Sequence, residues 1–263
     1  MRVTALMENT AGRPGVVAEH GLSLLVETGS HVVLFDMGQS GAFASNAAVL
    51  GVDLSQVDVA VISHGHYDHG GGLPAFLELN DHASIYVNRR AFEEHRNAAG
   101  KGIGLDPALA GSDRLVYVDD HLDLGDGLEL FSCNDRRRTH GTGSVGFTAR
   151  EGGRLVPDAF LHEHYLLVTE QGRKVLFSGC SHKGILDIEG WFEPDVLVGG
   201  FHFMRIDVEG DGRRVLDDAA RELMGHRTAY FTCHCTGLGQ YRCLKAAMAD
   251  QLGYLACGQT VEV

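Results

Sequence analysis

The residues best suited to chemistry lie in one short stretch that contains the pattern His64-x-His66-x-Asp68-His69. Three imidazoles and one carboxylate within six residues form a set of metal ligands, because imidazole suits zinc, iron, nickel and copper, and a carboxylate adds charge and an oxygen ligand. On a turn, His64 and His66 can face one ion while Asp68 and His69 face a second. The neighbouring glycines allow the tight backbone path that such a turn needs. The pattern therefore predicts a metal centre with room for two ions.

Further histidines follow short apolar runs that are typical of buried strands. Three of these runs end at turns that carry His182, His202 and His234. Because ligand sites of α/β sheets lie beyond the carboxyl ends of strands, we expect these side chains to share one edge with the His64 stretch. Five other histidines are expected to be solvated at the surface: His31, His82, His95, His121 and His226.

Along the chain, apolar runs that predict strands alternate with stretches that predict helices, and these elements must position the turns. Such alternation is typical of an α/β protein. Strands are expected at 22–27, 31–35, 57–62, 85–87, 115–118, 128–132, 165–169, 174–178, 195–198, 229–232 and 260–263. Helices are expected at 42–50 and 74–79, from 91 onward, and at 184–191, 213–224 and 240–252. The glycine-rich segment 100–112 is expected to be a long functional loop. No linker or repeat divides the sequence, so one domain over residues 1–263 is the simplest interpretation.

The composition excludes several classes of function. The chain has 263 residues, is 44% hydrophobic and carries a formal net charge of −13, which argues against a dedicated nucleic-acid binder and leaves a small molecule as the expected substrate. There is no apolar run of about 18 residues and no leader-like start, so we expect a cytoplasmic protein without a membrane span. The six cysteines are irregularly spaced, which favours free thiols or metal ligands over disulfides. The oligomeric state is left open.

Several stretches spread over the chain resemble the metallo-β-lactamase superfamily, and within it the branch that includes the dihydropterin–ribofuranosylaminobenzene-phosphate synthases and many uncharacterised hydrolases. These stretches are 19–23, 34–41, 63–72, 178–182, 199–202 and 233–237. The HxHxDH pattern is specific for the superfamily, and the other stretches are specific for the branch but not for a substrate. The resemblance implies an α/β fold (α+β in some schemes), a four-layer αββα sandwich with a mono- or dinuclear metal site at one edge.

The same resemblance implies ligands for two divalent ions. Those of the first ion would include His64 and His66, and those of the second would be Asp68, His69 and His234. Zinc is the metal that we expect first. Manganese and iron are alternatives, because all three accept histidine and carboxylate ligands.

One position departs from the family pattern. Many members carry Gly-Asp after the strand that precedes this part of the site, and that aspartate bridges the two metals. Here the pair is Gly179-Cys180, so Cys180 could ligate as a thiolate instead. For the remaining ligand of the first ion, the order of preference is His182, then Glu163 or His162.

Other residues are candidates for contact with the substrate. His202 is expected at the cleft as a substrate contact. His20 is either a substrate or outer-shell group or part of a structural loop. Three consecutive arginines are either a solvated charge run or a bidentate site for phosphate or carboxylate: Arg136, Arg137 and Arg138.

The leading hypothesis is metal-assisted hydrolysis of a small ester, phosphoester or related substrate. Two cations would lower the pKa of a shared water and polarise the scissile group. Asp68 would act as ligand and proton acceptor, with His202 or His20 at the leaving group. A second hypothesis is a synthase or transferase that condenses a dihydropterin-like substrate with a phosphate-bearing arylamine. A third is an iron-containing redox or sensor protein, although the chain has no room for the flavin domain of the superfamily's diiron reductases.

Overall fold

Two seven-stranded sheets form the centre of the molecule in a computed structural model that describes residues 1–141 and 144–263. The first sheet has the order β17 (Thr260–Glu262), β1 (Arg2–Met7), β2 (Ser23–Glu27), β3 (Val32–Phe35), β4 (Val59–Ile62), β5 (Ser84–Asn88) and β7 (Leu115–Val118). The second has the order β16 (Leu252–Tyr254), β15 (Ala229–Thr232), β14 (Val196–Gly199), β13 (Arg173–Ser178), β12 (Tyr165–Glu170), β9 (Leu128–Phe131) and β8 (His121–Gly125).

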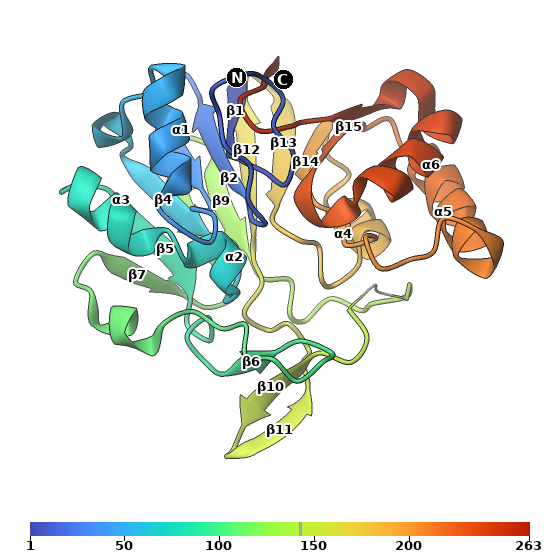
Figure 1. Cartoon of the computed structure of the whole chain (residues 1–263), viewed down its shortest axis with the longest axis horizontal. Helices are drawn as coiled ribbons and strands as arrows, with labels where there is room; N and C mark the ends of the chain where they lie inside the picture. Colours follow the sequence, from blue (N-terminus) through green and yellow to red (C-terminus); the bar gives the residue numbers. More distant parts are fainter. Residues whose placement is uncertain (142–143) are drawn as a thin grey trace.

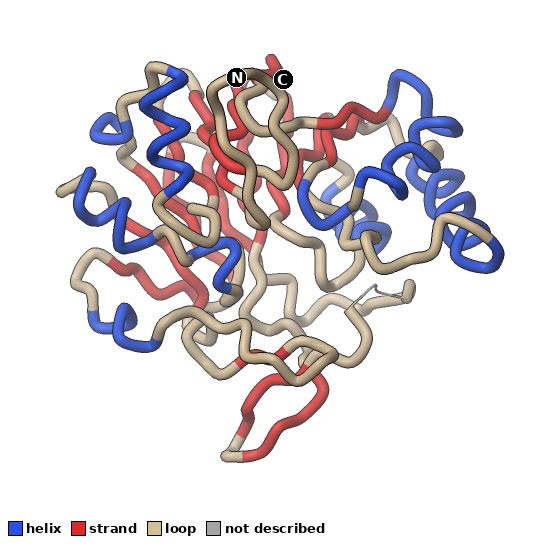
Figure 2. The backbone as a smooth tube through the Cα atoms, in the orientation of Figure 1, coloured by secondary structure: helices blue, strands red, loops and turns tan. Residues whose placement is uncertain are grey.

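Helices cover the outer face of each sheet, which gives four layers (Figures 1 and 2). On the side of the first sheet lie α1 (Ala42–Leu50), α2 (Tyr67–Gly70) and α3 (Leu73–Leu79). On the side of the second lie α4 (Ile185–Phe192), α5 (Gly210–Leu223) and α6 (Leu238–Met248). The αββα sandwich expected from the sequence is therefore confirmed.

The core between the two sheets is made by side chains from both of them. Phe35 on β3 and Phe177 on β13 meet there with ring centroids 5.9 Å apart. Strands β4 and β14 are buried at every residue, because each is covered by helices on one face and by the other sheet on the opposite face. This burial explains why both read as continuous apolar runs rather than as alternating ones.

Parallel pairing decides where the strand ends meet. Strands β3, β4, β5 and β7 pair in parallel, and so do β13, β14, β15 and β16. The carboxyl ends of these strands lie at one edge of the sandwich, and the loops that follow β4, β13, β14 and β15 carry the predicted histidines. The positions of these turns agree with those predicted from the sequence.

Some elements differ from the sequence expectation. The helix expected from residue 91 does not form, and this segment turns into β6 (His95–Arg96). Strand β6 joins a small third sheet with β10 (Thr148–Glu151) and β11 (Arg154–Pro157), which the sequence did not predict. Strand β1 was also missed. It pairs with β17, so the two ends of the chain lie side by side (Figure 1). Among the described residues, no helix is both long and apolar enough to cross a bilayer.

Candidate metal centre

Many of the predicted site residues line a small cavity of about 110 Å³ at the edge where the parallel strands end. The loop after β4 contributes His66 and Asp68, and the loop after β13 contributes Cys180 and His182. Further lining residues come from the loops after β14 and β15, namely His202 and His234. The two halves of the sandwich therefore each supply part of one cavity.

The backbone turns sharply after four strands along this edge, β3, β13, β14 and β15. Four residues that are not glycine have left-handed backbone conformations there, with φ of 62° at Asp36, 55° at Ser181, 56° at His202 and 46° at His234. Such conformations are rare outside glycine and concentrate at functional sites. A side chain at Gly179 would collide with Ser63, so the loop after β13 can approach the His64 turn only because this position is glycine.

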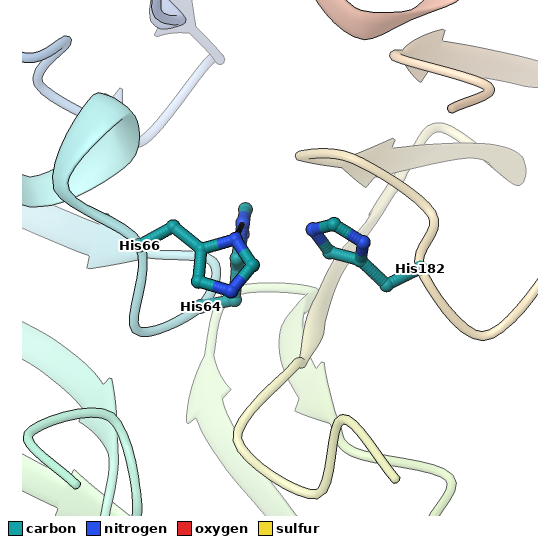
Figure 3. A group of neighbouring side chains, drawn as sticks. All are labelled: His64, His66 and His182. Carbon is teal, nitrogen blue, oxygen red and sulfur yellow. Dashed lines mark hydrogen bonds between the residues drawn. The ribbon is translucent and has the colours of Figure 1, made fainter. Parts of the chain in front are cut away.

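The first donor group consists of His64, His66 and His182. Nε2 of His64 lies 3.0 Å from Nδ1 of His66, and one ring nitrogen from each of the three residues lies within 4.8 Å of the others. Figure 3 shows His182 facing the other two from a separate loop. Ligand atoms about 2.0–2.1 Å from a tetrahedral ion lie about 3.3 Å apart, so this group has suitable dimensions.

Burial and the neighbouring imidazoles lower the pKa values of these three histidines well below the usual value. The rings are therefore neutral near pH 7, as metal ligands must be. Nε2 of His66 and Nε2 of His182 are buried and have no hydrogen-bond partner among the described residues. Unpartnered buried nitrogens are rare in folded proteins and need an explanation, which a bound cation provides for His182.

Hydrogen bonds fix which nitrogen of each ring carries the proton. The hydroxyl of Ser63 donates to Oδ2 of Asp36 at 2.8 Å, so Nδ1 of His64, 2.9 Å from the same hydroxyl, must donate to it. Nδ1 of His69 donates to Oδ2 of Asp36 at 2.6 Å. Nδ1 is thus the protonated nitrogen of both rings, and Nε2 is the atom that could ligate a cation. Burial opposes the charged form of His69, but Asp36 and Asp68 raise its pKa, so an ion at its Nε2 would displace a proton.

The second donor group is held in the same way. Nδ1 of His234 donates to the amide oxygen of Asn9 at 2.8 Å, and its Nε2 lies 3.2 Å from Nε2 of His69. Oδ2 of Asp68 lies 3.4 Å from Nε2 of His234 and 3.8 Å from Nε2 of His69. Burial opposes ionisation of Asp68, but the charge of His69 and hydrogen bonds from His20 and His234 hold the pKa of its carboxyl well below the usual value. Asp68 is therefore an anionic oxygen donor.

Cys180 lies between the two groups. Its Sγ is 3.2 Å from Nε2 of His69, and it forms one cluster with His64 and His69 and another with His234 and Cys235. Burial, reinforced by the adjacent Cys235, raises the pKa of the Cys180 thiol well above its usual value. In the absence of a cation the thiol is thus neutral, whereas a bound cation would favour the thiolate.

Comparison with known proteins agrees with this geometry. The family model described as the metallo-beta-lactamase superfamily matches residues 16–226. The chain belongs to this superfamily. A curated relative from Methanocaldococcus jannaschii, 7,8-dihydropterin-6-methyl-4-(beta-D-ribofuranosyl)-aminobenzene-5'-phosphate synthase, is 29% identical over 265 residues, covering 90% of this chain and 88% of the relative.

Two solved structures share this fold. One is described as a metal-dependent hydrolase of the beta-lactamase superfamily. It is 27% identical, with a TM-score of 0.81, and covers 100% of this chain and 99% of its own. The other is zinc-bound PqqB from Methylobacterium extorquens, which is 12% identical, with a TM-score of 0.61 and full coverage of both chains. Superfamily membership supports metal binding by this chain.

Glu163 and His162, the predicted alternatives to His182, are not part of the first donor group. The carboxylate of Glu163 accepts the backbone N–H groups of His182 and Lys183, at 2.7 and 3.1 Å, and the hydroxyl of Tyr165 at 2.7 Å. Glu163 therefore shapes the loop that presents His182. Nδ1 of His162 accepts the N–H of Gly65 at 2.9 Å. This ring therefore contacts the backbone of the loop that carries His64 and His66.

The predicted substrate contacts have different outcomes. His202 lines the cavity, and its Nδ1 lies 3.2 Å from the hydroxyl of Ser144. His20 lies at the mouth, 44% exposed, with Nε2 3.1 Å from Oδ2 of Asp68. None of the three consecutive arginines lines the cavity: Arg136, Arg137 and Arg138. Arg205 does, and its guanidinium lies 5.2 Å from the ring centroid of Phe147.

The sequence analysis missed several residues that shape the site. Asn9 and Ser144 gave no local signal, because their roles depend on partners distant in the chain. Arg205 could have been found, since it lies three residues after His202 on a loop already expected at the cleft. His95 was wrongly placed at the surface. Its side chain is 1% exposed and pairs with Asp158, with Nδ1 and Oδ2 3.0 Å apart.

Proposed function

We propose that the protein is a metal-dependent hydrolase with a dinuclear site. The observation that carries the proposal is that two groups of potential metal ligands, each drawn from loops of both halves of the sandwich, meet at one edge of it. The first ion would be held by His64, His66 and His182. The second would be held by Asp68, His69 and His234, and Cys180 would occupy the position between them. The donor set of nitrogen, sulfur and carboxylate oxygen fits zinc best, with manganese and iron as alternatives.

When bound, two such ions supply Lewis acidity and lower the pKa of a shared water. The chain's own residues supply the remaining functions. Asp68 is oriented by the ring of His20, which stands between the cavity and solvent. His20 and His202 border the cavity on different loops, so either can donate a proton to a leaving group. Asp36, Asn9 and Ser63 keep the ligand rings in the required tautomers.

An anionic group on the substrate fits the mouth of the cavity. Arg205 is exposed there and is the only arginine among the described residues that line the cavity. The guanidinium of Arg205 lies over the ring of Phe147, which limits the motion of the side chain and leaves its N–H donors available. A guanidinium binds phosphate or carboxylate through paired donors. We therefore infer that the substrate is a phosphoester, or an ester or lactone that carries an acidic group.

A second candidate is a synthase that acts on a pterin-like compound and a phosphate-bearing arylamine. It is supported by the name of the M. jannaschii relative, which matches over most of both chains. In this reaction the same centre would activate a leaving group rather than water. Arg205 would serve equally well for its phosphate.

The deciding experiment combines metal analysis with a substrate panel. Elemental analysis of the purified protein should give about two metal equivalents. The wild type, Asp68→Asn and the control variant Asp113→Asn, whose substituted residue is exposed, should then be assayed with phosphodiesters, lactones and thioesters, and the wild type also after chelation. Turnover that chelation and Asp68→Asn abolish, and that Asp113→Asn retains, supports the hydrolase. Two bound metals without hydrolysis of any of the panel, but with condensation of the pterin and arylamine substrates, would favour the synthase. One equivalent or fewer would refute the dinuclear site.

A further inference from the structure

A second buried cluster lies behind the first donor group. It consists of His95, Asp158 and His162, whose side chains are 1%, 3% and 1% exposed. Nδ1 of His95 and Nε2 of His162 lie 3.0 and 3.4 Å from the same carboxylate oxygen of Asp158. The other oxygen of Asp158 accepts the backbone N–H of Phe160 at 2.6 Å. The carboxylate is thus held from several directions.

This cluster adjoins His66. A ring nitrogen of His66, one of His162 and a carboxylate oxygen of Asp158 lie within 4.8 Å of one another. The ring centroids of His66 and His162 are 5.3 Å apart. His66 is 3% exposed, and its Nε2 has no hydrogen-bond partner among the described residues, while its Nδ1 faces His64 in the first donor group.

Proton positions argue against a third metal ion in this cluster. Nδ1 of His162 accepts the backbone N–H of Gly65, so it carries no proton, and the proton of this ring is on Nε2. A metal ion at Nε2 would need that nitrogen unprotonated and would require the bond to Gly65 to break. Nε2 of His162 has no hydrogen-bond partner among the described residues, but a cation there would break the bond from Gly65, so the geometry favours an outer-shell role for the cluster over a third ion.

We propose that Asp158 is a positioning residue of the metal centre, whose carboxylate accepts the Nε2–H of His66, directly or through one water, when Nδ1 of His66 holds the first ion. A histidine that ligates a metal through one nitrogen carries its proton on the other and usually donates it to a carboxylate or carbonyl. Hydrogen bonds from His95 and from the N–H of Phe160 fix the carboxylate in place. This inference rests on the proposed function, because it assigns an outer partner to one of the proposed ligands.

The contact between Asp158 and His66 should strengthen the binding of the first ion and not that of the second. Asp158 would orient His66 and increase its basicity, whereas the corresponding partners of the second ion are Asp36 on His69 and Asn9 on His234. Loss of an outer-shell partner of this kind weakens metal binding about 10–100-fold. Asp158→Asn should therefore weaken the first site by this factor and leave the second nearly unchanged.

Cobalt titration of the full-length protein, followed by absorbance and calorimetry, tests this without any substrate. We expect the wild type and Asp113→Asn to bind two ions, and Asp158→Asn to bind one of them about 10–100-fold more weakly. If Asp158→Asn does not fold, His95→Phe and His95→Asn provide a matched pair. Asparagine can still donate to Asp158, so only the phenylalanine variant should weaken the first site.

Three results would overturn the proposal. One is wild-type affinity at both sites in Asp158→Asn. Another is an equal loss at both sites together with a lower melting temperature, which indicates a structural role alone. The last is a third cobalt equivalent in the wild type that Asp158→Asn removes, because this identifies a third ion site. A wild type that binds no cobalt would instead refute the proposed function, so the two failures are distinguishable.

Discussion

Replacement of Asp36 by asparagine tests how the second donor group is assembled. The carboxylate of Asp36 is fully buried and accepts three hydrogen bonds: from the N–H of Ser63 at 2.7 Å, from its hydroxyl at 2.8 Å, and from Nδ1 of His69 at 2.6 Å. An asparagine oxygen can keep the first of these. Its NH₂ group would then stand where one carboxylate oxygen accepted the other two, so two donors would lose their acceptor.

The magnitude follows from these contacts. A hydrogen bond to a charged group contributes about 1.5–3 kcal/mol, so Asp36→Asn should lower the free energy of unfolding by about 3–6 kcal/mol. This is a large fraction of the roughly 5–15 kcal/mol that holds a typical domain together. Because Nδ1 of His69 would no longer have an acceptor, Nε2 would compete for the proton. The second ion should therefore bind about 10–100-fold more weakly.

Urea unfolding of the metal-free protein and cobalt titration measure the two effects separately. The exposed-site variant Asp113→Asn serves as the control for the loss of one negative charge. Ser63→Ala is a milder variant if Asp36→Asn does not fold: it removes one of the three bonds and should affect His64 rather than His69. The reasoning about proton positions is refuted if Asp36→Asn unfolds within about 1 kcal/mol of the wild type and binds both ions with unchanged affinity.

Two further predictions concern substrate binding and thiol reactivity. Arg205→Ala should raise KM for an anionic substrate by about tenfold or more with little change in kcat, since it removes a charge-assisted contact made before the chemical step; steady-state kinetics measures this, and an unchanged KM would exclude Arg205 from binding. Burial raises the pKa of Cys133 and of Cys257 to about 11, so their thiolate fraction at pH 8 is about 0.1% and rises tenfold per pH unit below that pKa. Cys243, which is half-buried, should react first with an alkylating reagent at pH 8, as mass spectrometry of the labelled protein would show, whereas equally fast labelling of Cys133 would contradict its burial.

The sequence predicted elements whose signals are local. Helix α1 has the expected bounds, and Gly51 ends it in the left-handed conformation, with φ of 73°. The helix expected from residue 91 failed because a competing local signal was overlooked. The side chain of Asn88 accepts the N–H of Arg90 at 2.9 Å, which forms a tight turn in place of a helix.

The same distinction applies to the site. His64, His66, Asp68 and His69 could be recognised because they are neighbours in one turn. The partners that orient the rings were not recognisable, since they come from remote segments: Asn9 and His234 are 225 residues apart. An outer partner such as Asp158 leaves no spacing pattern, because its role arises only when the loops pack.

Under the proposed function, the strain in the left-handed residues at the strand ends would make the stability of the fold depend on the bound metal. Non-glycine residues held in such conformations cost about 1–3 kcal/mol each, and Asp36, Ser181, His202 and His234 all contribute to this cost at one edge of the sandwich. An ion that binds only the folded chain adds about 4.1 kcal/mol of stability at a concentration 1,000 times its dissociation constant. Under the proposed function, metal shortage would reduce the amount of folded protein as well as its activity, so the abundance of the protein in a cell would follow the availability of its metal.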